Sequence, residues 1–256
     1  MLDQIAAIVR EAGKLILKAR ASAVHYKEGH FNFVTDTDVA VQAFLKRELL
    51  RVLPEAGFFS EEQENEPLTD RATFVVDPID GTVNFTRNRS MSAISIGLME
   101  KKRPVMGVVC NPYADEIVTA EKGRGAYLNG SPIRVSRTPF DQALVVFGTA
   151  PYDAELAARS MRCAQAFLLR AGDIRRSGSA AIDLADVACG RADLFFELRL
   201  RPWDVAAGSL LVQEAGGNFY SLGHDRPYYD DACGILAANP RCSGKAMDIV
   251  SRILAA

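Results

Sequence analysis

The stretch from Val75 to Phe85, VVDPIDGTVNF, sets Asp77 and Asp80 three residues apart in one turn. The proline between them pushes the preceding residue toward an extended backbone, and the glycine after them permits a left-handed turn. Both carboxylates can therefore face one point, where their repulsion would keep one protonated unless a cation or strong donors offset the charge. The stretch thus indicates a cation site, although two acids in a solvated turn explain the same residues.

The composition is typical of a globular protein with a large core. Of 256 residues, 48% are hydrophobic and 24% are charged. We therefore expect a single domain over 1–256, built of two tightly packed subdomains at about 1–145 and 146–256. The 30 Lys and Arg residues against 32 Asp and Glu residues give a net charge of -2. No broad positive field favours nucleic acid or an anionic membrane as a partner.

The chain lacks the sequence features of a membrane anchor. No apolar run approaches the roughly 20 residues that span a bilayer, and the N-terminal stretch carries charges inside its apolar pattern. We therefore expect an unanchored cytoplasmic protein. The five cysteines are odd in number and never stand in a CxxC spacing, which predicts buried reduced thiols.

The hydrophobic pattern predicts an α/β fold. Apolar residues recur at helical spacing over 3–21 and again in a helix that Thr37 or Asp38 can cap. A short strand from Thr73 to Val76, which includes the first two residues of the quoted stretch, should stop at Asp77. Further strands are expected at 93–99, 105–110, 117–121 and 143–147, with a hairpin turn at Asn129-Gly130. The second half alternates helices at 153–171, 179–189, 204–216 and 243–254 with strands at 193–198, 218–221 and 234–237. This order predicts sheets layered with helices and leaves the strand pairing open.

Further acids stand where they could reach the same site. Glu61 and Glu62 follow the apolar pair Phe58-Phe59, so a strand could deliver them there. Asp204 follows Trp203 at the start of a helix, and capping of that helix would by itself explain this acid. The carboxylate of Asp38 has the same simple explanation.

Two long motifs in order resemble the inositol monophosphatase family of magnesium-dependent, lithium-sensitive phosphatases. They are DPIDGTVNF at 77–85 and WDVAAGSLLVQEAGG at 203–217, preceded by VTDTD at 34–38 and SEE at 60–62. The resemblance covers nearly the whole chain. It implies a layered α-β-α-β-α structure of the α/β (α+β) class, and a homodimer.

The resemblance also implies a site for two or three Mg²⁺ ions. Glu61, Asp77 and the backbone carbonyl of Ile79 match the ligands of one ion. Asp77, Asp80 and Asp204 match those of a second, so that Asp77 bridges the two. Carboxylate and carbonyl oxygens are the ligands that Mg²⁺ prefers.

The catalytic residues implied by the resemblance are Asp38, Thr82 and Glu61. Asp38 and Thr82 match the pair that orients the attacking water, with Asp38 accepting its proton through the threonine hydroxyl. The expected reaction is direct in-line attack of a metal-activated water on a phosphate monoester, without a covalent phosphoenzyme. Such an enzyme is a phosphoric monoester hydrolase.

The substrate residues implied by the resemblance are Gly81, Thr82, Gly178, Ala180 and Glu197. Backbone NH groups of the first two match a phosphate cradle. The two residues near 180 can open a helix and lend NH groups to a sugar or phosphate, although a plain helix start is an equal alternative. The carboxylate of Glu197 matches an acid that binds substrate hydroxyls. Inositol monophosphate is the expected substrate, with fructose 1,6-bisphosphate, histidinol phosphate and 3'-phosphoadenosine 5'-phosphate as alternatives.

Two other functional hypotheses remain open at this point. Phosphatases of the haloacid dehalogenase type also carry an Asp-x-Asp-Gly-Thr motif, but their acids are two residues apart and the first is the nucleophile. A metal-stabilised partner-binding protein could use Arg175, Arg176, Arg199 and Arg201 as a contact surface, whereas solvated or ion-paired arginines are the simpler explanation. Either Arg199 or Arg201 could instead reach a second substrate phosphate. The stretch FGTAPYD at 147–153 matches the family poorly.

Overall fold

The computed structural model describes residues 1–19, 24–26, 33–222 and 231–255. Its helices are α1 (Leu2–Lys18), α2 (Asp36–Val52), α3 (Thr82–Thr86), α4 (Ala154–Leu168), α5 (Ala180–Ala188), α6 (Pro202–Glu214) and α7 (Ser243–Leu254), with a 3-10 turn η1 (Phe140–Gln142). Its strands are β1 (Val24–Tyr26), β2 (Phe33–Thr35), β3 (Gly57–Ser60), β4 (Thr73–Asp80), β5 (Ala93–Glu100), β6 (Arg103–Asn111), β7 (Glu116–Glu121), β8 (Ala126–Leu128), β9 (Ser131–Ile133), β10 (Leu144–Phe147), β11 (Asp173–Arg175), β12 (Leu194–Leu200), β13 (Asn218–Leu222) and β14 (Cys233–Ala238).

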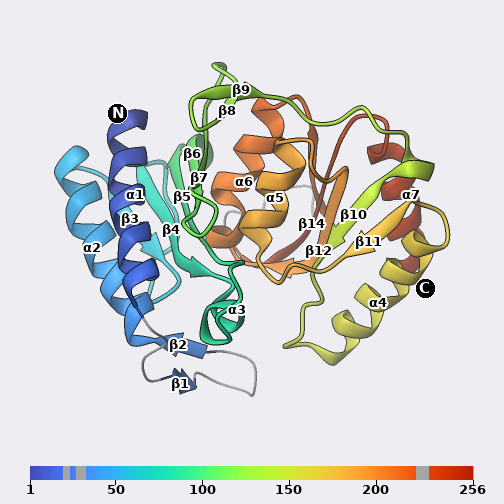
Figure 1. Ribbon diagram of the computed structural model, residues 1–256, viewed down its shortest axis with the longest axis horizontal. Coiled ribbons are helices and arrows are strands. Elements are labelled where there is room, and N and C mark those ends of the chain that lie inside the picture. The colour runs from blue at the N-terminus through green and yellow to red at the C-terminus, as the bar shows by residue number, and fades with distance from the viewer. Residues whose placement is uncertain (20–23, 27–32, 223–230, 256) are drawn as a thin grey trace.

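These elements form five alternating layers of helices and sheets (Figure 1). The first sheet has the order β3-β4-β5-β6-β7-β8-β9 and the second the order β11-β10-β12-β14-β13. Helices α1 and α2 cover the outer face of the first sheet, α5 and α6 lie between the sheets, and α4 and α7 cover the outer face of the second. The layered α-β-α-β-α prediction is therefore confirmed.

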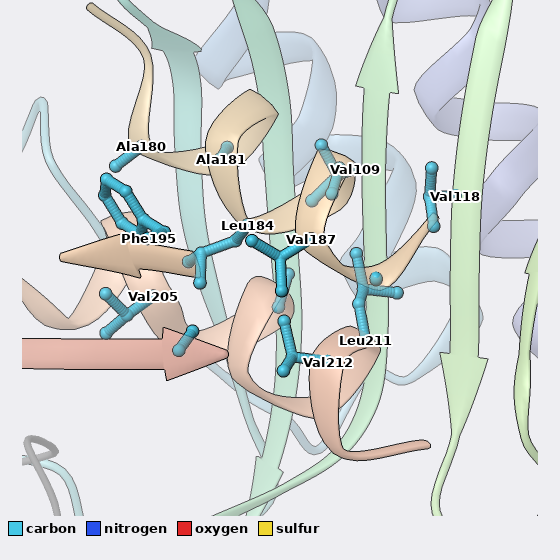
Figure 2. Packing of buried hydrophobic residues seen from close by; sticks show 14 of the residues in the cluster. Val109, Val118, Ala180, Ala181, Leu184, Val187, Phe195, Val205, Leu211 and Val212 are labelled. Carbon is cyan, nitrogen blue, oxygen red and sulfur yellow. The ribbon is translucent and has the colours of Figure 1, made fainter. Parts of the chain in front are cut away.

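Both sheets are buried on both faces, which explains why their strands are apolar along most of their length. In β6, Val108 faces the cluster under α1 and α2, whereas its neighbour Val109 faces the cluster around α5 and α6. In β12, Phe195 joins the central cluster and Phe196 the outer one. Figure 2 shows the central cluster, where side chains of α5 and α6 pack between the two sheets.

Several element boundaries differ from the sequence prediction. Helix α2 begins at Asp36 with Thr35 as its N-cap, so the prediction of Thr37 or Asp38 as the cap is wrong. Asp38 instead occupies the third helical position, where its carboxylate accepts the backbone NH of Thr35 at 2.9 Å and completes a capping box. Strand β4 runs on through the acidic turn to Asp80, with a shift in its pairing to β5 between the two aspartates.

The predicted hairpin turn and the predicted unpaired cysteines agree with the structure, whereas several short elements were not predicted. The Asn129-Gly130 turn is confirmed, because both residues have positive φ (47° and 81°) and join β8 to β9. The short elements β8, β9, β11 and α3 were not predicted. All five cysteines are free, four of them buried and Cys189 partly so, as expected. Among the described residues, no helix combines the length and apolar character needed to cross a membrane.

Helix α6 lies unusually close to the first sheet because two strand residues there are glycines. A Cβ at Gly97 of β5 would lie 2.8 Å from the Cβ of Ala206, and one at Gly107 of β6 would lie 2.8 Å from the carbonyl oxygen of Ala207. Helix α6 also contacts β13 and β14 of the second sheet. These contacts support the proposal that 1–145 and 146–256 are two halves of one domain.

We expect the Gly97→Ala variant to be destabilised by about 1–3 kcal/mol, because its methyl group overlaps Ala206 and must push α6 outward. Gly244→Ala is the matched control, since a Cβ at this helical position meets nothing within 4 Å. That control should be neutral or more stable by up to about 1 kcal/mol. Urea unfolding of both variants measures the difference, and equal midpoints would contradict this account of α6 packing.

Candidate active site

Three carboxylates from the two halves of the chain meet between β4 and α6. Asp77 and Asp80 come from the end of β4, and Asp204 comes from the first turn of α6. One carboxylate oxygen from each lies within 4.8 Å of the others. Asp77 is 1% exposed and Asp80 is 8% exposed, so water cannot screen their mutual repulsion well.

Two of these carboxylates are oriented by nearby backbone NH groups. Asp77 Oδ1 accepts a hydrogen bond from the backbone N of Ile79 at 3.0 Å, within the proline turn itself. Asp204 Oδ2 accepts one from the backbone N of Arg201 at 2.7 Å, at the start of α6. Asp204 therefore does cap the start of α6, but only its Oδ2 takes part in that contact. That anchor directs the carboxylate but leaves its second oxygen for another partner.

The third carboxylate, Asp80, is held from across the molecule. Its Oδ2 accepts the backbone NH of Ala181 at 2.8 Å and the hydroxyl of Ser179, both at the N-terminus of α5. A hydrogen bond from the backbone NH of Gly81 also lowers the pKa of Asp80. Three carboxylates that are oriented in this way and lie within 4.8 Å of one another are a donor set that fits a hard divalent cation.

Burial raises the pKa of all three groups, and repulsion between carboxylates adds to it for Asp77 and Asp204. Desolvation is the largest cause of the raised pKa of Asp77, followed by the negative charges of Glu61, Asp80 and Asp204. Desolvation also raises the pKa of Asp204 well above its usual range and that of Asp80 to about 6. The ionised cluster is therefore unfavourable unless a positive charge is bound there.

Glu61 reaches the edge of this cluster through β3. That strand pairs in parallel with β4, and the backbone N of Glu61 donates to the carbonyl of Val76 at 3.3 Å. This register sets the carboxylate of Glu61 close enough to raise the pKa of Asp77, although it lies outside the three-carboxylate group. The carbonyl of Ile79 accepts the hydroxyl of Thr82 at 3.1 Å.

Asp38 and Thr82 are not joined by a hydrogen bond within the described part of the chain. Asp38 is 1% exposed, and its Oδ2 accepts both the NH and the hydroxyl of Thr35. Burial raises its pKa to about 6. The hydroxyl of Thr82 points instead to the carbonyl of Ile79, so a water shared by the pair would require that hydroxyl to turn.

Glu197 faces the cluster from the second sheet. Its Oε1 accepts the backbone NH of Ala150 at 3.2 Å, and β12 changes register just after it. Burial raises its pKa to about 7, and the charge of Asp80 adds to the effect. A Cβ at Gly148 would lie 1.8 Å from Glu197 Oε2, so only glycine at that position leaves room for the carboxylate.

The N-termini of α3 and α5 meet beside the cluster. Gly81, the N-cap of α3, has φ of 85°, and a Cβ there would lie 3.1 Å from the carbonyl oxygen of Gly178. Gly178 has φ of 89° and precedes Ala180, the first residue of α5. The predicted residues Gly81, Thr82, Gly178 and Ala180 are therefore brought together, with two helix N-termini that favour an anion.

Tyr152 and Arg176 were missed by the sequence analysis as neighbours of the site. Tyr152 is 69% exposed overall, but desolvation at its hydroxyl and then the negative charges of Glu61 and Asp204 raise the pKa of that group. The positive charge of Arg176 acts on Glu197 and lowers its pKa. Tyr152 stands in the stretch at 147–153, which matches the family poorly, so the motifs did not point to it. The structure brings this stretch to the site through the hydrogen bond from the backbone NH of Ala150 to Glu197.

The other arginines that the sequence analysis considered are ion-paired. Arg175 pairs with Asp173 at 2.5 Å. Arg199 pairs with Asp153 at 3.5 Å and Arg201 pairs with Asp231 at 3.2 Å. The simpler explanation of these three residues, that they form surface ion pairs, is confirmed.

A model of the inositol monophosphatase family matches residues 1–254. The chain belongs to the inositol monophosphatase family. It is 42% identical over 218 residues to inositol monophosphatase 2 of Solanum lycopersicum, which covers 81% of this chain and 82% of that protein. It is also 37% identical over 253 residues to the Nus factor SuhB of Xylella fastidiosa, covering 94% of this chain and 90% of that protein.

Solved structures of the family share the fold. The inositol monophosphatase (IMPase) of Thermotoga maritima has a TM-score of 0.90 at 29% identity and covers 99% of this chain and 98% of that one. The extragenic suppressor protein SuhB of Bartonella henselae has a TM-score of 0.89 at 31% identity and covers 97% of each chain. The family is metal-dependent, and the three-carboxylate group provides the donors for such ions.

We expect Mg²⁺ to stabilise the protein more at about pH 7.5 than at about pH 5. In the unfolded chain these carboxyl groups have a pKa near 4, whereas burial raises the folded pKa of Asp80 to about 6. The metal-free fold therefore binds protons more tightly, so this contribution to stability is full below about pH 4 and is lost as the pH rises through about 6.

Thermal unfolding with EDTA or with Mg²⁺, at constant ionic strength, measures this difference. At a hundredfold excess over its Kd, a bound ion adds about 2.7 kcal/mol. NaCl at the same ionic strength is the control for screening. An equal Mg²⁺ effect at both pH values would argue that the ion binds away from the carboxylates.

Proposed function

We propose that the protein is a magnesium-dependent phosphomonoesterase that hydrolyses inositol monophosphate to inositol and phosphate. The observation that carries this proposal is the group formed by Asp77, Asp80 and Asp204, whose carboxylate oxygens lie within 4.8 Å of one another and are oriented by backbone NH groups. The hydroxyl-binding candidate Glu197 faces this group. Membership of the family and the 42% identity to a plant inositol monophosphatase support the same activity.

The proposed cation ligands are those implied by the motifs. Glu61, Asp77 and the carbonyl of Ile79 would hold one Mg²⁺, and Asp77, Asp80 and Asp204 a second, with a third ion possible in the reaction. When bound, Mg²⁺ lowers the pKa of water and stabilises a leaving alkoxide. The residues of the chain fix where that chemistry occurs, because Asp77, Asp80 and Asp204 are oriented by backbone NH groups.

The proposed proton acceptor is Asp38, acting through Thr82, and Glu61 completes the catalytic set. Burial suits Asp38 to this role, because a pKa raised to about 6 brings it nearer to neutral pH than that of an exposed aspartate. The threonine hydroxyl would leave the carbonyl of Ile79 and donate to Asp38 while it accepts from water. Direct attack of that water on phosphorus then needs no protein nucleophile.

The proposed phosphate cradle is built from Gly81, Thr82, Gly178 and Ala180 at the two helix N-termini. Glu197 would accept hydrogen bonds from hydroxyl groups of the leaving alcohol. The ion pairs of Arg199 and Arg201 with aspartates disfavour a second phosphate at those residues. Histidinol phosphate remains a competing substrate, because Glu197 could equally pair with an amine.

A second proposed role is binding of a protein partner. Relatives from several bacterial strains, at 37–38% identity, carry the name Nus factor SuhB, and one fold would serve both roles. We also propose a homodimer whose interface includes Met161 and Leu168 of α4 and the C-cap residue Leu169, since they are 55%, 51% and 73% exposed. Light scattering on the purified chain measures its mass, and a monomer at micromolar concentration would contradict this state.

Initial rates of phosphate release test the main proposal. We expect inositol monophosphate to be hydrolysed with Mg²⁺ and not with EDTA, and added Li⁺ to inhibit. Fructose 1,6-bisphosphate, histidinol phosphate and 3'-phosphoadenosine 5'-phosphate should be slower. A higher kcat/KM for one of these would reassign the substrate, and no Mg²⁺-dependent release from any of them would favour the partner-binding role.

We expect Thr82→Ala to lower kcat by roughly 100-fold or more, because the water loses the hydroxyl that orients it. Thr86→Ala is the matched control on the same short helix. Its hydroxyl also donates to a carbonyl three residues earlier, at 3.0 Å compared with 3.1 Å for Thr82. Wild-type turnover in Thr82→Ala, or an equal loss in Thr86→Ala, would contradict the assigned role.

A further inference from the structure

The loop Ser177-Gly178-Ser179 of the second half of the chain forms hydrogen bonds with the stretch Asp77 to Asn84 of the first half. Asn84 of the turn donates its side-chain NH to the carbonyl of Ser177 at 3.1 Å and to that of Met91 at 2.8 Å. All three side chains that define this contact, Asn84, Ser177 and Ser179, are buried. The loop and the turn therefore form one rigid joint, although they lie 93 residues apart in sequence.

The hydroxyl of Ser179 has two partners in this joint. It accepts the backbone NH of Ile182 at 3.3 Å, which caps α5. It also donates to Asp80 Oδ2, the same oxygen that accepts the NH of Ala181. Because both donors converge on one oxygen, the other oxygen of Asp80 has a fixed direction.

Hydrogen bonds with Ser177 hold the backbone of Ser179 in place. Its backbone NH donates to Ser177 Oγ at 3.0 Å, and Ser177 Oγ donates to the carbonyl of Ser179 at 3.2 Å. Asp183, which is 2% exposed, interacts with the same Ser177 hydroxyl from the first turn of α5. The Ser179 side chain thus has little freedom to leave Asp80.

The two glycines of the joint are closely packed against their neighbours. A Cβ at Gly81 would lie 3.3 Å from the Cβ of Ser179, and one at Gly178 would lie 3.2 Å from the side chain of Asn84. If the Ser179 hydroxyl is removed, the glycines and buried polar groups around it offer no other side chain to donate a hydrogen bond to Asp80. Water entry is limited as well, since Asp80 is 8% exposed.

We propose that Ser179 is a positioning residue for the cation site, which orients Asp80 and ties that orientation to the N-terminus of α5. The inference rests on the proposed Mg²⁺ site. It assigns the hydroxyl a role beyond helix capping, because the same group that starts α5 also selects which oxygen of Asp80 meets the ion. Residues that support a metal ligand in this way typically change metal affinity 10- to 100-fold when lost.

Mg²⁺ affinity measured by calorimetry, without substrate, tests this role. We expect Ser179→Gly to weaken Mg²⁺ binding by roughly 10- to 100-fold, whereas its effect on the helix start is small because glycine is an acceptable N-cap. Ser179→Thr keeps the hydroxyl and should bind Mg²⁺ within about threefold of wild type. A Ser179→Gly protein that binds Mg²⁺ as wild type does would overturn the inference.

Ser136→Ala provides the matched control. The hydroxyl of Ser136 donates to Asp193, a buried aspartate whose other oxygen accepts the backbone NH of Leu144 at 2.7 Å. This repeats the serine-to-aspartate contact outside the candidate site. We expect Ser136→Ala to lower the unfolding temperature without changing Mg²⁺ affinity.

The remaining outcomes also decide between explanations. If Ser136→Ala weakens Mg²⁺ binding as much as Ser179→Gly does, the effect is general loss of packing and the positioning role is wrong. If Ser179→Gly fails to fold, Ser179→Thr decides, because loss of Mg²⁺ affinity in a folded threonine variant contradicts the role. A wild-type protein that binds no Mg²⁺ overturns the cation site, and with it this inference.

Discussion

The close approach of α6 to the first sheet is the constraint on which the candidate site depends. Gly97 and Gly107 leave the helix in contact with the backbone of two strands, at separations that any Cβ would prevent. Only at this distance can Asp204, in the first turn of α6, share a point with Asp77 and Asp80 at the end of β4. The close packing of α6 on the first sheet is therefore a precondition for bringing the three carboxylates together.

Four helices begin at residues of the site, and this arrangement gives it a common electrostatic character. Asp38 and Asp204 stand in the first turns of α2 and α6, whereas Thr82 and Ala180 open α3 and α5. Each helix N-terminus carries roughly half a positive charge. These partial charges favour carboxylates at the site, and they would favour the phosphate of the proposed substrate as well. Asp38 and Asp204 both stand at the third helical position and accept the backbone NH of the N-cap residue, so helix capping and the candidate site use the same carboxylates.

The sequence predicts most of the fold and the core of the site, because both depend on local patterns. Apolar periodicity locates the long helices and strands, and the two motifs identify Asp77, Asp80 and Asp204. The strand order could not be predicted, since it is set by packing between distant segments. The contact of Ser179 with Asp80 spans 99 residues and has no local signature. The cap at Thr35 was missed because three neighbouring residues can each cap a helix, and only the backbone geometry selects one.

Burial of the acidic cluster implies that the fold is locally frustrated. Asp77 is 1% exposed, and the negative charges of Glu61, Asp80 and Asp204 oppose its ionisation, so a neutral side chain of similar size would fit the metal-free protein better at this position. A chain that needed only the fold would gain stability by losing these acids. The same acids that could hold a cation therefore lower the stability of the metal-free fold. A bound positive charge would offset their repulsion.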